Sequence, residues 1–142
     1  MAASVPVPGY PNLRYVGGAA AKPAEQQLRP GFLSLLQSAA SHLGVVFDIF
    51  SGSGGPAVRG GGFAGDPHDK GVGADITVNG QPVGSVPGAV TVLHSLGLRS
   101  GATDFTYQGK PDPTHVDAVS NAGVVSNAAA STGSSIDSPD TF

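Results

Sequence analysis

The chain has 142 residues, with seven basic and ten acidic side chains and a net charge of −3. Its 22 glycines and 12 prolines are about twice their combined share in average proteins. Charged residues make up 12%, about half the usual fraction, so the sequence excludes a basic surface for nucleic acid or for an anionic membrane. Cysteine is absent, which excludes disulfides, thiolate metal sites and cysteine nucleophiles.

Composition divides the chain into three parts. Residues 1–28 are rich in Pro, Gly and Ala, which predicts an extended N-terminal arm with little core of its own. Residues 29–119 contain the apolar periodicities expected of a single domain. Residues 120–142 lack Lys and Arg and consist mainly of small polar residues, so we expect a tail that is disordered or docked on a partner. The sequence shows neither an export signal nor a membrane span.

In chain order, the first predicted element is a helix beginning at Pro30. Apolar residues recur at helical spacing up to Leu43, and Gly44 stands where a C-terminal cap belongs. A buried strand over 45–50 and a long glycine-rich loop over 51–67 follow. The further predicted elements are a hairpin over 74–83 turning at Asn79-Gly80, a helix over 88–96, and short strands near 103–107 and 114–119. This order predicts an α+β fold with a small antiparallel sheet and flanking helices.

Two residues near the glycine-rich loop are typical of a metal site. His68 precedes Asp75 by seven residues, and Asp75 opens an apolar strand where a carboxylate needs hydrogen bonds or a cation. The small residues between them, Gly71, Gly73 and Ala74, allow the backbone to bring the two side chains together. His42 and His94 lie in the predicted helices and are interpreted as structural or surface residues.

A third ligand is predicted at His115, if its strand pairs beside Asp75. Two imidazoles and one carboxylate leave a zinc ion with a position for water, which is the pattern of a catalytic site. Asp112, three residues before His115 on a proline-bounded turn, is the best-placed general base. Asp117 is the second choice, and at i+2 along a strand it can instead orient the histidine.

These residues resemble a known family of zinc peptidases. The segment His68-Asp69-Lys70-Gly71-Val72-Gly73-Ala74-Asp75, followed by Asp112-Pro113-Thr114-His115, is similar to the D-Ala-D-Ala carboxypeptidase type (peptidase family M15), whose fold the hedgehog signalling domain shares. The resemblance covers about half of the chain. It implies that His68, Asp75 and His115 bind Zn²⁺, that Asp112 is the catalytic acid/base, and that a zinc-activated water attacks a peptide carbonyl of bacterial peptidoglycan.

One departure from the family pattern concerns a positive charge. The family's Ser-Gly-Tyr-Arg reads Ser51-Gly52-Ser53-Gly54 here, so glycine stands where the family has its arginine. Arg59, five residues further on, is the candidate to supply the missing cation in catalysis. If no residue supplies this positive charge, the transition state loses several kcal/mol of stabilisation. The protein would then be a binding protein with a vestigial site.

The biological setting follows from the resemblance and the missing export signal. We expect a phage-associated peptidoglycan hydrolase, located in the virion or, after delivery, in the extracellular or periplasmic space. The arm and the tail are expected to dock on other virion proteins. Two alternatives stay open: a structural virion protein of the tail or capsid that keeps the fold with little or no catalysis, and a free-standing bacterial dipeptidase.

Overall fold

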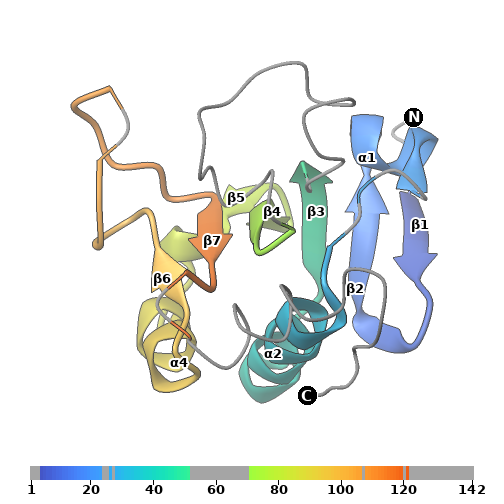
Figure 1. Cartoon of the computed structure of the whole chain (residues 1–142), viewed down its shortest axis with the longest axis horizontal. Helices are drawn as coiled ribbons and strands as arrows, with labels where there is room; N and C mark the ends of the chain where they lie inside the picture. The colour runs from blue at the N-terminus through green and yellow to red at the C-terminus, as the bar shows by residue number, and fades with distance from the viewer. Residues whose placement is uncertain are drawn as a thin grey trace.

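A computed structural model describes residues 4–23, 26, 28–51, 71–106, 108–119 and 121. Within these residues, seven strands form one mixed sheet in the order β1-β2-β3-β4-β7-β6, with β5 paired to β4 (Figure 1). The strands are β1 (Ser4–Val7), β2 (Tyr10–Val16), β3 (Phe47–Ser51), β4 (Gly73–Val78), β5 (Gln81–Pro82), β6 (Arg99–Ser100) and β7 (His115–Asp117). The described helices are α1 (Gly17–Ala21), α2 (Pro30–Leu43) and α4 (Ala89–Ser95), with a 3₁₀ turn η2 (Val83–Ser85). The α+β class is therefore confirmed.

Residues 4–16 are part of the sheet, whereas the sequence predicted an extended arm over 1–28 with little core of its own. β1 and β2 form an antiparallel hairpin, and Leu13 and Tyr15 of β2 are buried. Pro6 lies in β1, at the edge of the sheet, where a missing backbone donor is tolerated. The proline and glycine content therefore gave a misleading prediction. The alternation of buried residues in β2 favours a strand more strongly than this composition disfavours one.

The sheet is mixed, not purely antiparallel as predicted. β2 and β3 run parallel, with Leu13 opposite Phe47 and Tyr15 opposite Ile49. A parallel pair needs a long crossover, and the chain provides one between Val16 and Phe47 that contains α1 and α2. The other strand pairs are antiparallel.

The helix predicted from Pro30 is confirmed as α2, and its ends have the expected chemistry. Pro30 occupies the first helical position, where its missing N–H costs no hydrogen bond. Gly44 is left-handed, with φ 70°, and its N–H bonds back to the carbonyls of Ala40 and Ser41. The apolar face of α2 contributes Phe32 and Leu36, both fully buried, to the core.

The strand predicted over 45–50 and the hairpin predicted over 74–83 are both present. β4 and β5 turn at Asn79 (φ 51°) and Gly80 (φ 81°), the two left-handed positions of a tight hairpin turn. The helix predicted over 88–96 is α4. Residues 52–70, which hold most of the predicted glycine-rich loop, and residues 122–142 of the predicted tail lie outside the described residues.

The prediction of a strand near 103–107 is wrong for residues 103–106, which are the part that the structure describes. Residues 101–103 form a turn, in which the backbone N–H groups of Thr103 and Asp104 both bond to the carbonyl of Ser100. The strand here is β6, slightly earlier in the chain, and it pairs with β7. β7 is the strand predicted near 114–119.

The two faces of the sheet differ in character. Alternate residues of the central strands are buried and belong to one core with α2, among them Phe47, Ile49, Ala74, Ile76 and Val116. Because successive side chains of a strand point to opposite faces, the intervening residues point to the other face. These are Arg14, Asp48, Asp75, Thr77, Arg99, His115 and Asp117. The polar face therefore carries the residues of chemical interest.

Candidate metal centre

Asp75 and His115 come from neighbouring strands and stand directly opposite each other. Asp75 is in β4, His115 is in β7, and they are register partners in the antiparallel pair. This pairing is the one that the sequence required if His115 was to share an ion with Asp75. Their strand neighbours Ala74 and Val116 are fully buried on the core face, so packing on that face holds the register that places the two polar side chains together.

Asp112 reaches the same place from the turn before β7. Its Oδ1 accepts hydrogen bonds from the hydroxyl of Thr114 at 2.8 Å and from the Thr114 N–H at 3.3 Å. The His115 N–H donates to the Asp112 carbonyl at 3.1 Å. These local bonds form a tight turn that fixes the Asp112 carboxylate relative to His115.

Gly101 fastens this turn to the sheet. Its N–H donates to the His115 carbonyl, and its carbonyl accepts from the Asp112 N–H, both at 2.9 Å. A Cβ at Gly101 would overlap the Asp112 carbonyl oxygen and crowd the Cβ of His115. Only glycine therefore allows this close approach of the two segments.

One ligand atom from each of Asp75, Asp112 and His115 lies within 4.8 Å of the others. The Nδ1 of His115 is 3.5 Å from Oδ1 of Asp75. Two ligands that each bind zinc at about 2.1 Å in tetrahedral geometry are about 3.4 Å apart. An imidazole with carboxylates is also a donor set suited to a divalent metal. The residues present therefore fit a metal ion.

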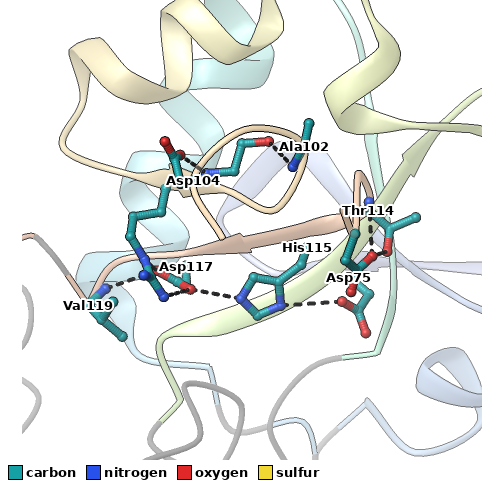
Figure 2. A network of polar contacts seen from close by, with 10 residues as sticks. Asp75, Ala102, Asp104, Thr114, His115, Asp117 and Val119 are labelled. Carbon is teal, nitrogen blue, oxygen red and sulfur yellow. Dashed lines mark hydrogen bonds and ion pairs between the residues drawn. The ribbon is translucent and has the colours of Figure 1, made fainter. Parts of the chain in front are cut away.

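The other ring nitrogen of His115 is engaged by Asp117. Nε2 lies 2.8 Å from Oδ2 of Asp117, whose side chain is fully buried. Asp117 also accepts from Arg99, with Nε to Oδ1 and Nη2 to Oδ2 both at 2.8 Å, and from the Val119 N–H at 3.3 Å. Figure 2 shows the resulting line of contacts from Val119 through Asp117 and His115 to Asp75. Asp117 thus lies on the same sheet face as His115 and contacts its ring, as its i+2 position predicts.

These contacts set the protonation of the pair. Burial alone would lower the pKa of His115, but the hydrogen bonds with Asp117 and Asp75 raise it to about 9. Burial would raise the pKa of Asp117, and the hydrogen bonds from His115 and Arg99 outweigh it, so this pKa lies below its usual value. Without a metal, His115 is thus protonated at neutral pH, and an ion that binds Nδ1 would displace that proton.

Phe105 packs against the histidine ring. Its ring meets the His115 ring edge to face, with centroids 5.0 Å apart and planes at 82°. The guanidinium carbon of Arg99 lies 4.8 Å from the centroid of the same phenyl ring. The segment carrying Phe105 is held by Asp104, which accepts from the Ser100 N–H at 2.6 Å and contacts His94 Nε2 at 2.8 Å.

The structure thus brings together three of the predicted site residues, Asp75, Asp112 and His115. The third predicted ligand, His68, and the predicted cation, Arg59, lie outside the described residues, as does Gly54. Neither of the other two histidines belongs to the cluster: His42 is exposed on α2, and His94 pairs with Asp104.

Sequence reasoning missed Arg99 and Phe105. Arg99 is the register partner of Asp117 across β6 and β7, an opposite-charge pair of the kind that stabilises antiparallel strands. The only signal was the pair of charges itself, which identifies a contact only when the strand order is known.

Comparison with known proteins gives no match: no family model, no curated protein and no solved structure is similar to this chain. In the described part of the chain, no helix combines the length and apolar character needed to cross a bilayer.

Proposed function

We propose that this protein is a zinc-dependent peptidase that cleaves peptide bonds of bacterial peptidoglycan. Asp75 and His115 hold the ion, and His68 is the third ligand. The observation that carries the proposal is the register pairing of β4 with β7. It brings Asp75 Oδ1 within 3.5 Å of His115 Nδ1, and Asp112 lies beside both.

The residues around the ion have separable tasks. Zinc in such a site would polarise the substrate carbonyl and lower the pKa of a water molecule. Asp112 is partly exposed and lies beside both ligands, so it would serve as the general base and acid of such a site, holding a proton between the attack of water and the departure of the amine. Its bonds to Thr114 hold the carboxylate in place, and Asp117 holds the histidine ring.

The substrate class comes from the resemblance to M15 peptidases, which act on the stem or cross-link peptides of the cell wall. We place the protein in a phage particle or, after delivery, in the extracellular or periplasmic space. In this proposal, contacts with other virion proteins use the tail and the N-terminal region, whose residues 4–23 belong to the folded domain. Arg59 is the proposed source of positive charge toward the substrate.

A second function is favoured by one feature of the sequence. Gly54 replaces the arginine of the family pattern, so a virion structural protein that keeps the metal but has little catalysis is the alternative. The two functions agree on the ion and differ on turnover.

Two measurements on the same preparation test the proposal. The first is the zinc content of the full chain after dialysis, which should approach one ion per chain and fall in His115→Gln. The second is the release of new amino groups from purified cell walls, compared with Asp112→Asn. We expect Asp112→Asn to keep the ion and to lose about 10²- to 10⁴-fold in rate.

The matched control is Asp48→Asn, because Asp48 lies on the same sheet face in a surface ion pair. This variant should resemble the wild type in both measurements. Equal rates for wild type and Asp112→Asn would refute the peptidase, and zinc without any cleavage would favour the structural alternative. A chain without zinc would refute both.

A further inference from the structure

We propose that Arg99 is a positioning residue of the metal centre. Through its two hydrogen bonds to Asp117, it fixes His115 so that Nδ1, and not Nε2, is the ligating nitrogen. This inference rests on the metal site of the proposed function. It adds a residue that no ligand pattern contains and specifies the nitrogen that binds.

The first step concerns the Asp117 carboxylate, which lies between Arg99 and His115. The Asp117 side chain is fully buried, and a buried carboxylate stays ionised only if it is paired and hydrogen-bonded. Arg99 supplies a planar fork that meets both oxygens at 2.8 Å, and the fork fixes the direction of the carboxylate as well as its charge. Asp117 is therefore held as an anionic acceptor.

The second step concerns the imidazole. An ionised carboxylate has no proton to give, so the 2.8 Å contact between Asp117 Oδ2 and His115 Nε2 requires that Nε2 donates. A neutral imidazole with its proton on Nε2 has its lone pair on Nδ1. Nδ1 is the nitrogen that faces Asp75, so the tautomer selected by Asp117 is the one that the metal needs.

The third step concerns the plane of the ring. Phe105 meets the His115 ring edge to face, and Arg99 lies over the same phenyl ring at 4.8 Å. Arg99 thus contacts both groups that define the ring orientation, Asp117 directly and Phe105 through its face. The loss of the guanidinium would leave the carboxylate without its cation and remove one side of the packing around Phe105.

Three variants of the full chain test the inference. Arg99→Gln removes the charge and the fork, Arg99→Lys keeps only the charge, and Arg14→Gln is the matched control. Arg14 is also the register partner of an aspartate on this sheet, but its pair is more exposed and does not belong to the Asp75, Asp112 and His115 group. Circular dichroism of the metal-free proteins establishes that each variant is folded.

Affinity is measured by titration with Co²⁺, whose visible absorption reports coordination, and by competition with Zn²⁺. We expect Arg99→Gln to bind about 10- to 100-fold more weakly, as for other residues that orient metal-bound histidines. Arg99→Lys should recover part of this loss, and Arg14→Gln should bind like the wild type. Long-range ¹H–¹⁵N spectra of the zinc-bound wild type should show the His115 proton on Nε2.

The outcomes separate this inference from the proposed function. A wild-type chain that binds no Co²⁺ overturns both. A wild type that binds, together with a folded Arg99→Gln of equal affinity, overturns only the role of Arg99. Spectra with the proton on Nδ1 also overturn it, whereas weaker binding in Arg99→Gln with partial rescue by lysine supports it.

Discussion

Two arginine–aspartate pairs on the same face of the sheet have different consequences. Arg14 and Asp48 are register partners across β2 and β3, and Arg99 and Asp117 are register partners across β6 and β7. In the first pair, both donors of the arginine meet one oxygen, and the arginine and aspartate side chains are 44% and 13% exposed. In the second pair, the donors meet both oxygens, and the two side chains are less exposed, at 31% and 0%.

The difference is a matter of burial and of a third partner. An exposed pair is solvated in both its formed and broken states, so it contributes little. A buried pair cannot lose one member without leaving a charge in a medium of low dielectric. Because His115 contacts Asp117, the buried pair also fixes a residue of the candidate metal site formed by Asp75, Asp112 and His115. The same two residue types therefore form a surface ion pair at Arg14 and Asp48, and orient a neighbouring histidine at Arg99 and Asp117.

The largest effect on stability is expected from removing the aspartate of the buried pair, with removal of the aspartate of the exposed pair as the comparison. Asp117→Ala leaves Arg99 and His115 without their shared acceptor, and we expect the metal-free chain to lose about 3–5 kcal/mol in the free energy of unfolding. Asp48→Ala should cost less than about 1 kcal/mol. Urea unfolding of the three proteins measures both losses. Equal losses would show that burial does not distinguish the pairs.

Stabilisation by zinc should be the next largest effect, and it should depend on His115, which contacts the buried pair, and not on the exposed pair. An ion at 100 times its dissociation constant stabilises the folded chain by about 2.7 kcal/mol. We expect this gain in the wild type and in Asp48→Asn, and its absence in His115→Gln, since only the last variant lacks a ligand. Thermal unfolding with and without zinc gives the gain for each protein. A gain retained by His115→Gln would place the ion elsewhere.

The sequence predicted the elements whose signals are local. Pro30 and Gly44 delimit α2, Asn79-Gly80 makes the hairpin turn, and Asp75 and His115 have the residue types of a metal site. The parallel pairing of β2 with β3 was not predictable, because strand order depends on contacts between distant segments. The role of Arg99 was hidden for the same reason, since it exists only once β6 lies beside β7.

The strand expected near 103–107 shows how local chemistry can also mislead. Thr and Phe favour strands, but the carboxylate of Asp104 accepts the Ser100 N–H and closes a turn instead. The close packing of Gly101 against Asp112 holds the same turn. Composition cannot show either contact.

A smaller effect is expected from the glycine that brings Asp112 into the site. In Gly101→Ala the new methyl group would overlap the Asp112 carbonyl, and relief of the overlap should cost about 1–3 kcal/mol and weaken zinc binding. Gly18→Ala is the control, because a Cβ there meets no atom within 4 Å. Urea unfolding and zinc titration of both variants test this. Unchanged zinc affinity in a folded Gly101→Ala would show that the site tolerates a displaced Asp112.

The smallest expected effect concerns the pH dependence of the turn that carries Phe105. Burial would raise the pKa of Asp104, but hydrogen bonds from Ser100 and His94 outweigh it and hold the pKa below its usual value. Because protonation is harder in the folded than in the unfolded chain, the Asp104 carboxylate stabilises the fold above about pH 4, and this contribution is lost as the pH falls further.

Asp104→Asn has no carboxylate to protonate at this position. Its stability relative to the wild type should therefore be lower near neutral pH, and the gap should narrow below pH 4. We expect a gap of less than about 1 kcal/mol, since the Asp104 side chain is 25% exposed. Urea unfolding of both proteins between pH 3 and 7 measures it. A gap that stays constant over this range would mean that the carboxylate charge does not hold the turn, and that backbone bonds and the packing of Gly101 suffice to keep Phe105 against His115.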